Sequence, residues 1–138
     1  MTKHIKVVAI DVYGTILATD DPDDELPARK GLDDLIQKCH KQVIRVSLHS
    51  SEDFQNVKLA LQAAGIDIHK FDSFYNLSGN PKDFSEIVRD YSITPRELLV
   101  IGDSDADING AKTIGARYFR VQRYKDHVDD FNLNVIAA

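Results

Sequence analysis

Two groups of acidic residues each follow an apolar stretch of the chain. Asp11 comes directly after the mostly apolar residues 5–10, and Asp103 and Asp107 come after the apolar residues 98–101. Parallel strands end at the same edge of a sheet, where open α/β folds bind their ligands, so we expect these carboxylates to meet there. Carboxylates at such short distances repel one another unless a cation lies between them, and a hard divalent ion such as Mg²⁺ suits that place. The pattern therefore predicts an acidic site that binds Mg²⁺.

Two short motifs carry a resemblance to a known family. The first is Asp11-x-Tyr13-Gly14-Thr15-Ile16, and the second is Gly102-Asp103-x-x-x-Asp107. In this order, and each after an apolar stretch, they resemble the haloacid dehalogenase-like superfamily, whose members are mostly Mg²⁺-dependent phosphatases with an aspartate nucleophile. The resemblance covers residues 5–121. It departs from the phosphatase pattern at one position, because Tyr13 stands where those enzymes carry a second aspartate.

The resemblance implies a role for each residue of the two motifs. Asp11 would attack the phosphorus atom of a phosphomonoester and form an aspartyl phosphate, which water then hydrolyses. Mg²⁺ would hold the negatively charged reactants together. Its ligands would be Asp11, the main-chain carbonyl of Tyr13, Asp103 and, directly or through water, Asp107. Gly14 and Thr15 would form a sharp turn that lets phosphoryl oxygens approach backbone N–H groups, which a Cβ at position 14 would hinder.

Two further positions of the family's site have more than one candidate. The hydroxyl that binds the phosphoryl group at the end of the second strand is assigned to Ser47, with Ser50 as second choice. Ser50 alternatively caps the next helix. The lysine that neutralises the nucleophile and the phosphate is assigned to Lys82. Counting back from residues 94–95 places Asn80 nearer the register of that lysine, so the alternative that Lys82 faces solvent stays open.

Tyr13 leaves three functions open. In the phosphatases the second aspartate protonates the leaving group and then activates water, whereas a tyrosine with a pKa of about 10 is a poor base at neutral pH. The favoured function is a Mg²⁺-dependent phosphatase, and a slow one, assisted by the substrate or by a group such as His49. The second is a degenerate family member that binds without turnover. The third is a 2-haloacid dehalogenase, because type II enzymes of the superfamily carry a similar Asp-x-Tyr-Gly-Thr motif.

The spacing of these residues predicts that the chain has no cap domain. The interval from Asp11 to Ser47 has room for a loop and one helix, and the interval from Ser47 to Lys82 for one helix and one strand. Dehalogenases carry a helical cap in the first interval and need no cation, so both features argue against that activity. A site without a cap is expected to admit a phosphate on a large molecule or to take a lid from a second copy in a homo-oligomer. The acidic residues 20–25 either line the entrance or form a solvated loop.

Size and composition indicate one globular domain over residues 1–138, with 43% hydrophobic and 28% charged residues. No apolar stretch approaches the roughly 20 residues of a membrane span, and residues 1–4 do not resemble a signal peptide. The net charge of −5 argues against general binding of nucleic acid. The single cysteine, Cys39, is typical of a reducing compartment. We therefore expect a cytoplasmic protein with a phosphorylated substrate and no membrane partner.

Alternating apolar and polar segments predict an α/β fold, a Rossmann-like three-layer α/β/α sandwich with five mainly parallel strands. The strands are expected at residues 5–11, 43–48, 73–77, 98–101 and 118–121. Helices are expected at residues 31–40, between residues 50 and 65, and at residues 82–91 and 105–115, with a helical turn at 94–97. Residues 131–138 are expected to pack against the domain.

Overall fold

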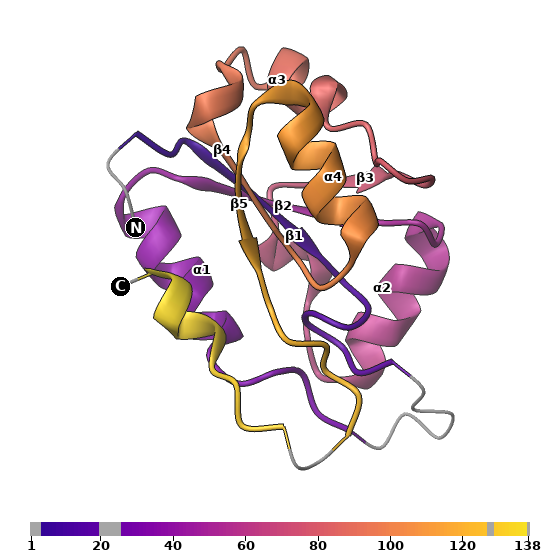
Figure 1. Cartoon of the computed structure of the whole chain (residues 1–138). Helices are drawn as coiled ribbons and strands as arrows, with labels where there is room; N and C mark the ends of the chain where they lie inside the picture. The colour runs from indigo at the N-terminus through magenta and orange to yellow at the C-terminus, as the bar shows by residue number, and fades with distance from the viewer. Residues whose placement is uncertain (1–3, 20–25, 127–128, 138) are drawn as a thin grey trace.

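A five-stranded parallel β-sheet forms the centre of the molecule (Figure 1). The computed structural model describes residues 4–19, 26–126 and 129–137. The strands are β1 (Val7–Asp11), β2 (Arg45–Ser50), β3 (Ser73–Asn76), β4 (Leu98–Gly102) and β5 (Arg117–Arg120), and their order in the sheet is β3-β2-β1-β4-β5. Every neighbouring pair is parallel, which confirms the predicted α/β class and its Rossmann-like sheet.

Helices cover both faces of the sheet, as the three-layer prediction requires (Figure 1). The α-helices are α1 (Leu32–Lys41), α2 (Phe54–Ala63), α3 (Ser85–Asp90) and α4 (Asp105–Ile114). Short 3-10 helices are η1 (Ile68–Lys70), η2 (Pro95–Glu97) and η3 (Leu133–Ala137). Side chains of α1, α2 and η3 belong to the core on one face, and side chains of α3 and α4 belong to the core on the other.

The second strand lies further along the chain than predicted. It was expected at residues 43–48, but it begins at Arg45 and extends to Ser50. The turn that ends α1 uses residues 42–43, where Val43 has a left-handed φ of 59° and donates its N–H to the carbonyl of His40. The carboxyl end of this strand, which faces the site, is therefore formed by Ser50 rather than by the residues near position 48.

The third helix also begins later than predicted. It was expected to start at Lys82, but α3 begins at Ser85. The Asp83 side chain accepts hydrogen bonds from the N–H and the hydroxyl of Ser85, and such local side-chain bonds favour a turn before a helix. Lys82 consequently lies in a loop, free of helical geometry, when it approaches the sheet.

The central strand β1 is buried on both of its faces, which explains why its sequence is a continuous apolar run. Val8 and Ile10 contact the core on the α1 and α2 side, whereas Val7 and Ala9 contact the core on the α3 and α4 side. Burial on both faces fixes the register of the strand. Asp11, its last residue, is therefore held in a defined position at the edge of the sheet.

The described residues between β1 and β3 form no cap domain, as the spacing predicted: α1 lies between β1 and β2, and α2 and η1 lie between β2 and β3. The C-terminal segment packs against the domain through Leu133, which is buried and donates its N–H to the carbonyl of Lys30. None of the helices in the described ranges is long and apolar enough to cross a membrane. The acidic residues 20–25 lie outside the described residues, so their place at the entrance stays a prediction.

Candidate active site

A cleft of about 490 Å³ opens at the carboxyl edge of the sheet and contains predicted acidic residues. The register places Asp11 beside His49 of β2 and Ile10 beside Ile101 of β4, so the ends of the three strands adjoin. The cleft is lined by Asp11, Tyr13, Thr19, Ser50, Ser51, Gly79, Lys82, Asp103, Ser104, Ala106 and Arg123. The residues of the two sequence motifs thus converge at one opening, with Asp107 fully buried behind them.

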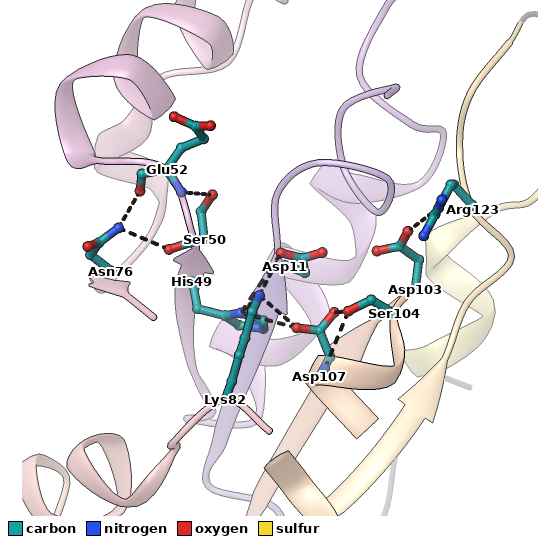
Figure 2. Close-up of polar contacts among 10 residues, drawn as sticks. All are labelled: Asp11, His49, Ser50, Glu52, Asn76, Lys82, Asp103, Ser104, Asp107 and Arg123. Atoms are coloured by element: carbon teal, nitrogen blue, oxygen red, sulfur yellow. Dashed lines mark hydrogen bonds and ion pairs between the residues drawn. The ribbon is translucent and has the colours of Figure 1, made fainter. Parts of the chain in front are cut away.

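Lys82 places its ammonium group among the buried acidic residues (Figure 2). Its Nζ lies 2.7 Å from Oδ1 of Asp107 and 3.4 Å from Oδ1 of Asp11. Nδ1 of His49 lies 3.3 Å from the same nitrogen. The alternative candidate, Asn80, accepts a hydrogen bond from the exposed Asn109 side chain. The structure therefore brings Lys82, and not position 80, into contact with Asp11.

The loop that carries Lys82 is held against α4. The backbone N–H of Lys82 donates to the carbonyl of Ala106 at 3.1 Å. On the same helix, a Cβ at Gly110 would overlap the Lys82 carbonyl and the ring of Phe84. Glycine at position 110 therefore permits the close packing that directs the lysine side chain toward the sheet.

Asp103 and Asp107 follow β4 and are fixed by different partners. Oδ2 of Asp103 accepts a hydrogen bond from Nε of Arg123 at 2.8 Å, with the guanidinium at the cleft wall (Figure 2). Asp107 lies in the first turn of α4, where the N-cap Ser104 accepts from its N–H and donates to its Oδ2. Asp107 thus stabilises the start of the helix, and the carboxylates of Asp103 and Asp107 both lie near enough to Asp11 to act on its charge.

The hydrogen bonds of Gly14 and Thr15 do not support the predicted contact of their N–H groups with phosphoryl oxygens. The N–H of Gly14 donates to the carbonyl of Leu17 at 2.7 Å, and the N–H of Thr15 donates to the carbonyl of Val12 at 3.3 Å. Both donors are therefore used by the turn itself. Glycine is favoured at position 14 for another physical reason, because a Cβ there would overlap the carboxylate of Asp103. This glycine lets the strand-end loop pass directly beneath an acidic residue of the site.

The structure also separates the two serine candidates. Ser47 lies beside Ala9, deeper in the sheet than Asp11, and its hydroxyl accepts from Ser73 and contacts the Ser73 carbonyl. It does not line the cleft, so this placement does not support a phosphate contact by Ser47. Ser50 ends β2 and lines the cleft. It does not cap α2, whose N-cap is Asp53.

Burial and charge shift the acidity of the buried groups in opposite directions. Burial and the neighbouring Asp107 raise the pKa of Asp11 well above its ordinary value, and Lys82 opposes this rise. Burial also acts to raise the pKa of Asp107, but the Lys82 ammonium and the hydrogen bond from Ser104 outweigh it and hold that pKa below its ordinary value. Burial lowers the pKa of His49 to about 3, so His49 is neutral at pH 7 and the charge beside Asp107 belongs to Lys82.

The residues of the cleft fit a hard divalent cation. Besides burial, the neighbouring carboxylates of Asp107 and Asp103 raise the pKa of Asp11, because each disfavours its charged form. A cation between Asp11 and Asp103 would offset the repulsion between their carboxylates and the cost of burying them. Carboxylate oxygens are also ligands that Mg²⁺ prefers. Tyr13, half-buried at the cleft wall, would add its carbonyl oxygen.

The structure argues against the prediction that His49 assists turnover directly. Its side chain is fully buried and does not line the cleft. Its ring packs edge-on against Phe84, with the ring centroids 4.9 Å apart. The contact of His49 with Lys82 and that of Arg123 with Asp103 were not predicted from the sequence, since no local pattern indicates a partner so distant along the chain.

Comparison with known proteins agrees with this geometry. The sequence profile of a family described as haloacid dehalogenase-like hydrolase matches residues 2–121. The fold is similar to that of CbbY from Rhodobacter sphaeroides, with a TM-score of 0.71 at 14% identity over 92% of this chain and 90% of that one. An enzyme of the same family from Bacteroides thetaiotaomicron, solved with magnesium and inorganic phosphate, has a TM-score of 0.68 at 17% identity, covering 90% and 98%.

A dehalogenase has a similar fold as well. The L-2-haloacid dehalogenase from Xanthobacter autotrophicus gives a TM-score of 0.68 at 14% identity, over 85% of this chain and 77% of that one. No relative was found among curated protein sequences. At these identities the solved structures establish a shared fold, and the chemistry has to be argued from the cleft.

Proposed function

Because the chain belongs to the haloacid dehalogenase-like hydrolase family, we propose that it is a Mg²⁺-dependent phosphomonoester hydrolase with Asp11 as its nucleophile. The observation that carries this proposal is the place of the Lys82 ammonium, 3.4 Å from Oδ1 of Asp11 at the wall of an open cleft. A fixed cation there attracts a phosphate dianion and favours the ionised form of Asp11, which is the form that attacks.

In the proposed first step, an oxygen of the Asp11 carboxylate attacks phosphorus, and the bond between phosphorus and the ester oxygen breaks. Ser50 binds a phosphoryl oxygen and the Lys82 ammonium attracts the phosphoryl group through its charge, since both residues line the cleft beside Asp11. The departing alkoxide needs a proton, and the Tyr13 hydroxyl is the donor that the cleft offers in place of the family's second aspartate.

In the proposed second step, water attacks the aspartyl phosphate, which releases inorganic phosphate and restores Asp11. A base that takes the proton of this water would accelerate the step by about 10²- to 10⁴-fold. The Tyr13 phenolate left by the first step regains a proton from solvent, because the ordinary pKa of a tyrosine lies near 10, and the neutral hydroxyl is then a poor base. His49 is sealed from the cleft, so the proton of the attacking water passes to solvent. We therefore infer that hydrolysis of the phosphoenzyme is slow and limits turnover.

The metal would be held by Asp11, Asp103 and the carbonyl of Tyr13, with Asp107 close behind. When bound, the ion supplies positive charge against the negative charge of the nucleophile and of the phosphoryl group. The magnesium and phosphate bound to the Bacteroides enzyme support this proposal for the family's fold.

The substrate that we propose is a phosphorylated compound, and the open cleft admits a large one. No cap domain covers the cleft within the described residues, so the phosphate of a macromolecule reaches Asp11 as readily as that of a small metabolite. Without closure, water exclusion and selectivity for small substrates are weak.

The test is a phosphatase assay on para-nitrophenyl phosphate with Mg²⁺, comparing the native protein with Asp11→Asn and Tyr13→Asp. Phosphate release by the native protein that Asp11→Asn abolishes supports the proposal. No release by the native protein, but release by Tyr13→Asp, would instead identify a binding protein that has lost turnover.

A second candidate is a 2-haloacid dehalogenase, because the chain shares its fold with such an enzyme and carries the Asp-x-Tyr-Gly-Thr motif. Release of chloride from 2-chloropropionate in the presence of a chelator would establish that activity. The acidic residues Asp11, Asp103 and Asp107 favour the phosphatase, because such a cluster suits a bound cation and dehalogenases need none.

A further inference from the structure

We propose that His49 is a positioning residue that holds the Lys82 ammonium in the active site by accepting one of its hydrogen bonds. The inference rests on the proposed function, because that function gives Lys82 its task at the nucleophile. His49 itself does not line the cleft, so it acts through Lys82 and not on the substrate.

The surroundings of the ammonium group carry this inference. An ammonium has three N–H donors and no acceptor. Around Nζ of Lys82 lie Oδ1 of Asp107 at 2.7 Å, Nδ1 of His49 at 3.3 Å and Oδ1 of Asp11 at 3.4 Å. Three donors thus meet three acceptors (Figure 2). The side chain of Lys82 is 7% exposed, so an acceptor removed from this set would leave a nearly buried donor without a partner.

The distances decide which role Nδ1 of His49 takes. It lies 3.8 Å from the Asp107 carboxylate and 3.9 Å from the Asp11 carboxylate, beyond the range of a hydrogen bond. The ammonium is closer, at 3.3 Å, and an ammonium only donates. Nδ1 is therefore the acceptor, and the ring proton resides on Nε2.

The path of the chain explains why Lys82 needs this support. The backbone at Lys82 is fixed by the hydrogen bond to Ala106, but a flexible four-carbon stem separates that backbone from the charge. Phe84 packs edge-on against the His49 ring and fixes its orientation. His49 is in turn carried by β2, directly beside Asp11 of β1. The ring thus connects the loop that supplies the lysine with the strand beside the nucleophile.

The substitutions His49→Leu and His49→Asn test the proposal. Leucine has nearly the volume of histidine but no acceptor, whereas the smaller asparagine places an amide oxygen near the position of Nδ1. We expect kcat/KM for para-nitrophenyl phosphate to fall about tenfold or more in His49→Leu and to be largely restored in His49→Asn. A role in packing alone predicts the reverse order, so equal or higher activity in His49→Leu would overturn the proposal. Thermal unfolding of each variant shows that it is folded.

A crystallographic comparison gives a readout that does not depend on turnover. In His49→Leu we expect Nζ of Lys82 to leave its place between Asp11 and Asp107, and in His49→Asn to keep it. If Nζ keeps its place in His49→Leu, the positioning role is refuted even where the enzyme is active. If the native protein hydrolyses no phosphomonoester, the proposed function fails, while displacement of Lys82 in His49→Leu still supports the positioning role.

Discussion

Gly14 lies so close beneath Asp103 that a Cβ at position 14 would overlap the Asp103 carboxylate. The contact joins the loop after β1 to the loop after β4, the two segments that carry the sequence motifs. It also explains why position 14 is a glycine, although the N–H of Gly14 donates within its own turn and not to a ligand.

We expect Gly14→Ala to displace Asp103 and to reduce both Mg²⁺ binding and phosphatase activity by about tenfold or more, since a misplaced ligand weakens a metal site. Gly65→Ala is the matched control, because Gly65 has a φ of 78° close to the 83° of Gly14 but open space where its Cβ would lie. Both variants should lose about 1 kcal/mol to backbone strain. Calorimetric titration with Mg²⁺ and urea unfolding separate the two effects, and equal metal binding in both variants would contradict the prediction.

Removal of the Lys82 charge should affect the nucleophile directly. Lys82 lowers the pKa of Asp11 against the raising effect of burial, so Lys82→Met should raise that pKa further. Because the proposed nucleophile is the ionised form of Asp11, we expect the acid limb of the pH profile of kcat/KM to move to higher pH, and kcat/KM at neutral pH to fall about 100-fold or more.

The control for this charge is Lys112→Met. Lys112 lies over the Tyr118 ring, at 5.4 Å from its centroid, and is not part of the cleft. Its loss should leave the pH profile unchanged. An acid limb that stays in place in Lys82→Met would show that the lysine does not act on Asp11.

Much of the site could be predicted because strand ends obey a local rule. Asp11 and Asp103 each follow an apolar run long enough to be a buried strand, and parallel strands end at one edge. Ser47 shows the limit of the same rule. Because of the turn at Val43, β2 ends two residues later than predicted. The predicted end therefore placed the phosphate-binding hydroxyl at Ser47, inside the sheet, whereas the hydroxyl at the observed end is that of Ser50. The exact residue at which a strand ends depends on backbone geometry, which the spacing of apolar residues does not reveal.

Contacts between distant segments could not be predicted in this way. Lys82 reaches the site because Gly110 of α4 lets the loop approach, and nothing near residue 82 in the sequence indicates that packing. The burial of His49 was equally hidden, because Arg45, Ser47 and His49 alternate with apolar residues along β2, and such alternation indicates a face exposed to solvent. Tertiary packing decides both cases.

His49 should make the protein sensitive to acid. Its pKa is about 3 in the folded protein against an ordinary value of 6.5, so between these pH values the unfolded chain binds a proton that the folded protein does not. The free energy of unfolding therefore falls as pH decreases through this window and has no such dependence above it. The expected loss is about 2 kcal/mol by pH 5.

Urea unfolding of the native protein and of His49→Asn, at about pH 7 and pH 5, measures this loss. The variant should lose less stability than the native protein over the same interval, since the titrating ring is absent. An identical loss in both proteins would show that other groups account for the acid sensitivity.

Arg29 anchors the C-terminal segment to the domain. Its side chain is fully buried, its Nη2 lies 2.7 Å from Oδ1 of Asp129, and its guanidinium lies 4.7 Å from the ring centroid of Phe131. We expect Arg29→Met to destabilise the protein by about 3–5 kcal/mol, because it leaves the nearly buried Asp129 carboxylate without its cation. Urea unfolding measures this loss. Adding Asp129→Asn to Arg29→Met should recover part of the stability, since the uncompensated charge is then removed. A double variant no more stable than Arg29→Met would instead indicate that Arg29 acts mainly through its packing against the aromatic rings, because that contact is missing in both variants.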